Sequence, residues 1–244
     1  MMKLHRDISS AGLHVLAMGL MLCDHLWATV IPGNDWLTCI GRLAFPIFAF
    51  LIVEGYAHTS NLRRYCLRLF LFALLSEIPF NLMVGSRFVY PIHQNVLWTF
   101  LLGLGLIHWN EKAKDAALWR RILRAASSVM VGMLAGTLTF VDYFGPGVVT
   151  VLVFYFFRER NWKNLLLQTA ALYYLNVELL SGLSYEVELF GRTFWIVQQG
   201  LALFALIPIW LYRGRKGHRS RAFQYFCYSF YPVHILILAL IKIM

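Results

Sequence analysis

Long runs of apolar residues, separated by short polar segments, follow one another along almost the whole chain. A helix needs about 20 apolar residues to cross the hydrocarbon core of a bilayer, and most of these runs approach that length. We therefore expect about nine membrane-spanning helices (eight to ten), at residues 10–31, 36–56, 62–83, 93–109, 122–141, 145–157, 162–180, 194–212 and 224–243. The sixth is too short to span untilted, so we expect a half-helix that stops inside the protein.

The pattern predicts an all-α integral membrane protein, with residues 1–244 forming a single transmembrane domain in contact with the lipid bilayer. Composition agrees, because 59% of the residues are hydrophobic, only 14% are charged and the mean hydropathy is +0.62. The first apolar run contains Asp24 and His25 and is too long for a cleaved signal peptide, so we expect it to remain as a helix.

The net charge of +10 would fit a nucleic-acid partner, but the positions of the charges argue against one. Eighteen of the 22 basic residues fall on one set of expected helix ends, namely Lys3, Arg6, Arg63, Arg64, Arg68, Lys112, Lys114, Arg120, Arg121, Arg124, Arg158, Arg160, Lys163, Arg213, Arg215, Lys216, Arg219 and Arg221. The opposite ends hold Arg87, Arg192 and Lys242. The positive-inside rule therefore predicts a cytoplasmic N-terminus and an external C-terminus.

Ionisable residues inside the expected spans are the candidates for a functional site, because a charge in hydrocarbon costs several kcal/mol unless it is paired or solvated. Asp24, His25, Glu77, Asn95 and Asp142 all fall in the outer half of the membrane or at its outer boundary, as does Arg42. The short turn at residues 32–34 makes the first two helices antiparallel neighbours, so Asp24 and Arg42 are expected to pair. A purely structural salt bridge is the alternative reading of that pair.

His25 is the candidate general base, because an unperturbed imidazole exchanges protons near neutral pH. Asp24 cannot easily orient it, since adjacent helical residues point about 100° apart. We expect the orienting carboxylate to come from another helix, with Glu77 or Asp142 as candidates. A histidine that only packs in the interior is the alternative.

Further polar groups lie within or beside the expected spans. Pro79 should kink the third helix beside Glu77, and Glu54 and His58 lie four residues apart on one face of the second. For Glu54, His58 and Arg68, a boundary network of side chains reaching toward water is as good a reading as ligand binding. Glycines and a proline follow Asp142 and Tyr143, and the last span carries the polar tip of His234.

Several blocks of sequence resemble the TraX family, which is named for a conjugation protein that N-acetylates F-type pilin and is related to the wider membrane-bound acyltransferases. The blocks that carry the resemblance are Met21-Leu22-Cys23-Asp24-His25, Gly41-Arg42-Leu43-Ala44-Phe45-Pro46, Glu54-Gly55, His58-Thr59, Arg68-Leu69, Ser76-Glu77-Ile78-Pro79-Phe80, Asn95, Thr99, Asp142-Tyr143 and Tyr231-Pro232-x-His234. They occur in the family's order and extend from about residue 10 to the end of the chain.

The resemblance implies a multi-pass bacterial-type plasma-membrane enzyme that transfers an acetyl group from cytosolic acetyl-CoA to an amine or hydroxyl. The acceptor could be a pilin N-terminus, a peptide, an envelope polymer or a small molecule. His25 and Asp24 would be catalytic, and substrate or acetyl-CoA would contact Arg42, Glu54, His58, Arg68, Glu77, Asn95, Asp142, Tyr143 and His234. No metal is expected.

Acyl transfer also needs donors for an oxyanion, for which we expect Arg42 or Asn95, and the phosphates of coenzyme A should meet Arg63, Arg64 and Arg68. Two other functions stay open. One is a transporter with a proton or solute path lined by carboxylates and histidines, and the other is a non-catalytic assembly factor for surface appendages.

Overall fold

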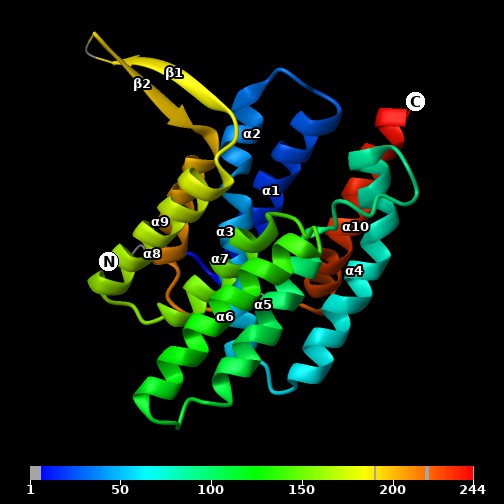
Figure 1. The fold of residues 1–244 in the computed structure, drawn as a ribbon. Helices are drawn as coiled ribbons and strands as arrows, with labels where there is room; N and C mark the ends of the chain where they lie inside the picture. Colours follow the sequence, from blue (N-terminus) through cyan, green and yellow to red (C-terminus); the bar gives the residue numbers. More distant parts are fainter. Residues whose placement is uncertain (1–6, 190, 218–219, 244) are drawn as a thin grey trace, which may run out of the picture.

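The computed structural model describes residues 7–189, 191–217 and 220–243, which form a helical bundle with one protruding β-hairpin (Figure 1). The first half of the chain contains helices α1 (Ser10–Thr29), α2 (Asp35–Gly41), α3 (Ala44–His58), α4 (Leu62–Gly85), α5 (Val96–Glu111) and α6 (Leu118–Leu138). The second half contains α7 (Phe144–Phe156), α8 (Trp162–Tyr173), a π-helical segment (Tyr174–Leu180), β1 (Ser184–Leu189), β2 (Arg192–Val197), a 3-10 helix (Gln198–Ala205), α9 (Leu206–Leu211) and α10 (Arg221–Ile243).

Four helical segments of the described chain are long and apolar enough to cross a membrane: Ser10–Thr29, Asp35–His58, Leu62–Gly85 and Ala222–Ile243. Large apolar side chains such as Leu75 and Ile78 on α4 are exposed, as lipid-facing residues of a helical membrane protein are. The structure therefore supports the membrane class, whereas the count of nine spans goes beyond these four. The expected span at residues 93–109 is displaced along the chain, since α5 begins at Val96 and ends at Glu111.

The short helix α7 forms the centre of the bundle, and every residue from Gly145 to Phe154 is buried. It packs against α3, α5 and α6, and its close approach to α6 depends on glycine. A Cβ on Gly136 would lie 2.6 Å from the carbonyl oxygen of Phe144, so any larger residue would separate the two helices. The expected short apolar helix at residues 145–157 is thus present, at residues 144–156.

The expected helical span at residues 194–212 is wrong over its first residues, because Arg192–Val197 is a strand. It pairs antiparallel with β1, so that Glu186 lies opposite Trp195. The physical reason is visible in β1, where Tyr185 and Val187 alternate with glutamates, the period of a strand rather than of a helix. Gly191, with φ +69°, lies between the two strands. The prediction of an all-α chain missed this hairpin.

Connections gather at two opposite ends of the bundle (Figure 1). The turn between α1 and α2, the hairpin and the end of α10 lie at one end, which we call the hairpin end. The connectors between α3 and α4 and between α5 and α6 lie at the other, which we call the basic end because Arg63, Arg64, Lys112 and Lys114 are located there. The long helices α4 and α10 pack against each other.

Candidate functional site

Two histidines from opposite ends of the chain form a hydrogen-bonded pair. Nδ1 of His25, on α1, lies 2.8 Å from Nε2 of His234, on α10. Nδ1 of His234 lies 2.7 Å from the carbonyl oxygen of Phe230. A carbonyl oxygen only accepts, so this second contact requires a proton on Nδ1 of His234.

The tautomer of His25 follows from that of His234. In a neutral His234, Nε2 must accept, and His25 must therefore donate from Nδ1. This leaves the lone pair of His25 on Nε2, which has no hydrogen-bond partner within the described part of the chain. The arrangement presents one imidazole nitrogen with its lone pair available, as a general base requires.

The residue that orients His25 is thus a histidine, and the expectation of Glu77 or Asp142 in that place was wrong. The carboxylates of Glu77 and Asp142 instead form hydrogen bonds with other groups. Asp142 nevertheless interacts electrostatically with His25, and so does Arg42. The structure thus brings His25 into contact with His234, while the charges of Asp142 and Arg42 lie within electrostatic range of His25 without a hydrogen bond to it.

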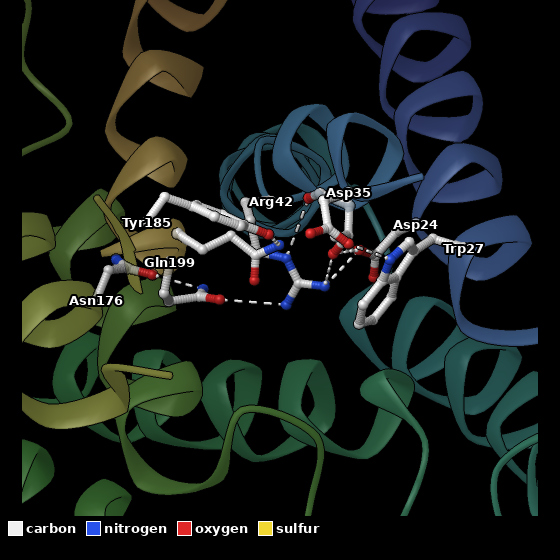
Figure 2. Close-up of polar contacts among 9 residues, drawn as sticks. Asp24, Trp27, Asp35, Arg42, Asn176, Tyr185 and Gln199 are labelled. Carbon is white, nitrogen blue, oxygen red and sulfur yellow. Dashed lines mark hydrogen bonds and ion pairs between the residues drawn. The ribbon is translucent and has the colours of Figure 1, made fainter. Parts of the chain in front are cut away.

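Asp24 and Arg42 form the ion pair that the sequence predicted (Figure 2). The hydroxyl of Thr38 bonds to both side chains. Nη2 of Arg42 donates to Oδ1 of Asp24 and to the hydroxyl of Thr38, and that hydroxyl donates to Asp24 at 2.7 Å. Nε of Arg42 donates to the backbone carbonyl of Thr38 at 3.3 Å. Arg42 therefore also caps the helix α2 that it follows.

A row of amides extends the ion pair toward the hairpin (Figure 2). Nη1 of Arg42 donates to Gln199 at 3.2 Å, and Gln199 donates to Oδ1 of Asn176 at 3.0 Å. These bonds use four of the five N–H groups of Arg42 and leave one on Nη1. Sequence reasoning missed Thr38, Gln199 and Asn176, because each is a common residue type whose role depends on long-range contacts.

The backbone at Gly41 makes the ion pair possible. A Cβ at this position would lie 2.5 Å from Cβ of Asp24, well inside van der Waals contact. Glycine therefore lets α2 approach α1 closely enough for Arg42 to reach the carboxylate. On the hairpin side, Trp27 donates to Asp35 at 3.0 Å, and the hydroxyl of Tyr185 accepts from Gln198 at 3.3 Å.

Asp142 pairs with His93, a residue that the sequence analysis did not single out. Nε2 of His93 lies 3.2 Å from Oδ1 of Asp142, which also accepts from the backbone N–H of Tyr143. His93 lies in the connector before α5, outside the spanning helices. The hydrogen bond to Asp142 raises the pKa of His93, and the negative charges of Asp142 and Glu77 add to this, while burial opposes it.

Tyr143 lies beside the ion pair. Its backbone is left-handed, with φ 60°, and its ring stacks on Phe45 with 4.0 Å between centroids. Tyr143 lies within electrostatic range of Arg42, Asp24 and Asp142. Of the expected site residues, Tyr143 is therefore among those that the structure brings close to the ion pair.

Glu77 and Asn95 lie together, but in structural roles. Oε2 of Glu77 accepts from Asn95 and from Nε1 of Trp98, the latter at 2.9 Å. The amide of Asn95 also donates to the carbonyl of Ala73, and its Oδ1 accepts from Leu97 as the cap of α5. Asn95 thus has both N–H groups and its oxygen engaged, so the expectation that it donates to an oxyanion is not supported by this geometry.

Glu54, His58 and Arg68 lie toward the basic end and do not form one cluster. Glu54 accepts from Nε of Arg158 at 2.8 Å, and Nδ1 of His58 lies 3.8 Å from the other carboxylate oxygen. Arg68 instead lies over the ring of Tyr228, 5.7 Å from its centroid. In residues 7–189, 191–217 and 220–243, no three His, Cys, Asp or Glu side chains gather as metal ligands would.

Comparison with known proteins gives two findings. A family model described as TraX protein matches residues 9–242. A probable fimbrial assembly protein FimC, serogroup H1, from Dichelobacter nodosus is 27% identical over 250 residues, which cover 97% of this chain and 96% of the relative. No solved structure matches.

Proposed function

The chain belongs to the TraX protein family, and from this premise we propose that it is a membrane-embedded acetyltransferase. In this proposal, an acetyl group passes from cytosolic acetyl-CoA to an amine or hydroxyl acceptor. The observation that carries it is the relay from the Phe230 carbonyl through His234 to His25, because the relay leaves Nε2 of His25 available as a base. In this proposal, His234 is the residue that positions the imidazole of His25.

The proposed reaction balances with groups of this chain and the two substrates. Nε2 of His25 takes the proton from the acceptor nitrogen or oxygen, which then forms a bond to the thioester carbonyl carbon. The carbon–sulfur bond breaks, and the imidazolium returns the proton to the thiolate of coenzyme A. General base catalysis of this kind accelerates a reaction by about 100- to 10,000-fold.

The oxyanion in this reaction needs a donor near His25. Arg42 keeps one N–H on Nη1 after its bonds to Asp24, Thr38 and Gln199 are counted. Its charge interacts with His25, which supports a position near the reacting carbonyl. We assign this donor role to Arg42, while Asp24 and Thr38 hold the guanidinium in place.

We further propose that the basic end faces the cytosol and the hairpin end faces outward, with about nine segments crossing or entering the membrane. The excess of lysine and arginine at one set of helix ends supports this orientation. Acetyl-CoA would then enter from the basic end, and the acceptor from the hairpin end. The name of the Dichelobacter nodosus relative, a fimbrial assembly protein, supports a pilus-type subunit as the first acceptor to test.

The test compares cells that carry the intact protein, His25→Ala or no protein, each supplied with isotopically labelled acetate. Mass spectrometry of the pilus, peptide, envelope and lipid fractions should find one species with an added acetyl group that depends on His25. If no fraction differs between the intact protein and the empty strain, the enzyme proposal fails.

A non-catalytic assembly factor is the second candidate, and the relative's name favours it. The two functions separate in the same strains. An assembly factor would support surface appendages equally well with His25→Ala, provided that the variant inserts and folds. An acetyltransferase would lose acetylation while the variant remains at normal levels in the membrane. Proton or solute flux driven by a gradient, without acetylation, would instead favour the transporter.

A further inference from the structure

A basic hollow lies at the basic end between α3, α5, α6 and α7. Its volume is about 910 Å³, within the roughly 300 to 1,000 Å³ typical of small-molecule sites. The residues that matter for its chemistry are Tyr56, Lys114, Arg121, Arg124, Tyr155 and Arg158. Neither α1 nor α10, the helices that carry the histidine pair, contributes a residue to this hollow. The hollow is therefore separate from the histidine pair.

The cations around this hollow differ in how far they are already engaged. In the described part of the chain, the side chains of Lys114 and Arg121 form no hydrogen bond or ion pair. Arg124 donates only from Nη1, to the carbonyl oxygen of Trp109 at 3.1 Å, and Arg158 pairs with Glu54. Lys114, Arg121 and Arg124 therefore retain most of their donors for an anion.

The acidic residues of the hollow do not cancel this charge. Glu111 lines it, but its carboxylate accepts a hydrogen bond from the hydroxyl of Tyr155 at 2.9 Å. Four cations line the hollow against the two carboxylates of Glu111 and Glu159, and three of the four remain once Arg158 is paired with Glu54. The excess of positive charge favours a ligand that carries several negative charges, and the rings of Tyr56 and Tyr155 offer apolar surface beside it.

The other candidate positions for phosphate are less suitable. A second hollow of about 770 Å³ contains Arg160, but that guanidinium donates to the carbonyls of Trp210 and Ile209 at 2.9 and 2.8 Å. Arg63 and Arg64 line neither hollow, and Arg68 lies over Tyr228. The geometry therefore does not favour Arg63, Arg64 and Arg68 as the residues that contact the phosphates.

We propose that this hollow binds the nucleotide part of coenzyme A, with Lys114, Arg121 and Arg124 contacting its 3′-phosphate and diphosphate. The inference rests on the proposed acetyl transfer and adds the residues that hold the donor. Val53, which lines the hollow, lies about 14 Å along the axis of α3 from its first residue, Ala44, and Arg42 lies just before that helix. The pantetheine arm would bridge that separation, leaving the thioester beside His25.

Binding to the purified full-length protein in detergent tests the assignment without any acceptor. The probes are coenzyme A and adenosine 3′,5′-bisphosphate, measured by calorimetry. The double variant Lys114→Gln with Arg121→Gln should weaken both ligands by about tenfold or more, because it removes two charge-assisted contacts. The matched control is Lys112→Gln with Arg120→Gln, which removes the same charge from the same two segments at residues that line neither of the two hollows.

The outcomes separate this inference from the function on which it rests. If the parent protein binds coenzyme A and the two double variants bind it equally well, the hollow is the wrong site while the enzyme proposal stands. If the folded parent binds neither probe, both proposals fail. Should the Lys114 and Arg121 variant fold poorly, Ala125→Trp provides a second test, since it fills the hollow without altering charge. Unchanged affinity in that variant would also overturn the assignment.

Discussion

Asp24 and Arg42 pair across the contact between α1 and α2, with the hydroxyl of Thr38 bonded to both. Each of the two side chains is about one-fifth exposed, so the pair is largely removed from solvent. A charge that loses its partner in such a place is more costly than the intact pair is stabilising. Because removing one partner costs more than removing both, the coupling between Asp24 and Arg42 can be measured from the stabilities of single and double variants.

Arg42→Ala should lower the free energy of unfolding by about 3 kcal/mol, because Asp24 is then left as an unpaired buried charge. The double variant Asp24→Asn with Arg42→Gln should recover much of that loss, since the amides can still bond to Thr38. Thermal unfolding in detergent, arranged as a double-mutant cycle, measures the coupling. Additive effects of the two single substitutions would contradict a coupled pair.

His25→Ala should reduce acetyl transfer by about 100- to 10,000-fold while the protein still folds and binds coenzyme A. His234→Ala should have a smaller effect, because it removes the group that orients His25 rather than the base itself. The rate with saturating acetyl-CoA and acceptor, measured with both variants, checks this order.

His234→Gln provides the control, since its side-chain oxygen can accept from Nδ1 of His25 as the histidine does. It should restore part of the rate lost in His234→Ala, with little change in KM. If His234→Ala and His234→Gln reduce the rate equally and the pH profile is unaltered, His234 serves packing alone.

Glu77 should tolerate an amide far better than a truncation. Oε2 accepts from Asn95 and Trp98, while Oε1 is buried with no partner in the described residues, so Glu77→Gln can retain both bonds. Glu77→Ala leaves two donors unsatisfied, at about 1 to 3 kcal/mol each. In chemical denaturation, the parent and Glu77→Gln should have similar free energies of unfolding, and both values should be well above that of Glu77→Ala. Equal loss in both variants would mean that the negative charge itself is required.

His93 should make stability depend on pH. Its pKa in the folded protein is raised by Asp142, so its contribution is fully present below the unfolded pKa of about 6.5 and is lost as the pH rises through the folded pKa. The difference in melting temperature between the parent and His93→Gln should therefore shrink as the pH rises from about 6 to 9. A difference in melting temperature that grows over this range would contradict a raised pKa of His93 in the folded protein.

Much of the helical framework could be predicted from apolar run length. The helices at Ser10 and Leu62 begin where predicted, and α10 begins at Arg221, three residues before its predicted start, because long apolar helices have few alternatives in a bilayer. The hairpin was missed because Phe194, Trp195 and Ile196 read equally well as the start of a helix. The alternation of Tyr185 and Val187 with glutamates was the signal that could have identified it.

The candidate site could be predicted only where sequence neighbours decide the contact. Asp24 and Arg42 were paired correctly because a short turn makes their helices adjacent. The partner of His25 was not, since His234 lies 209 residues away and nothing in one sequence fixes which face of the last helix meets the first. For the same reason, His93 and Gln199 remained unnoticed.

The separation of His25 and His234 along the chain also sets an order for biosynthesis. A ribosome delivers α1 to the membrane long before α10, which is the last helix of the described chain. Until α10 packs against α1 and α4, His25 has no group to fix its tautomer. The base is therefore oriented in the same step that completes the tertiary structure. A nascent or C-terminally truncated chain contains the first histidine without the second.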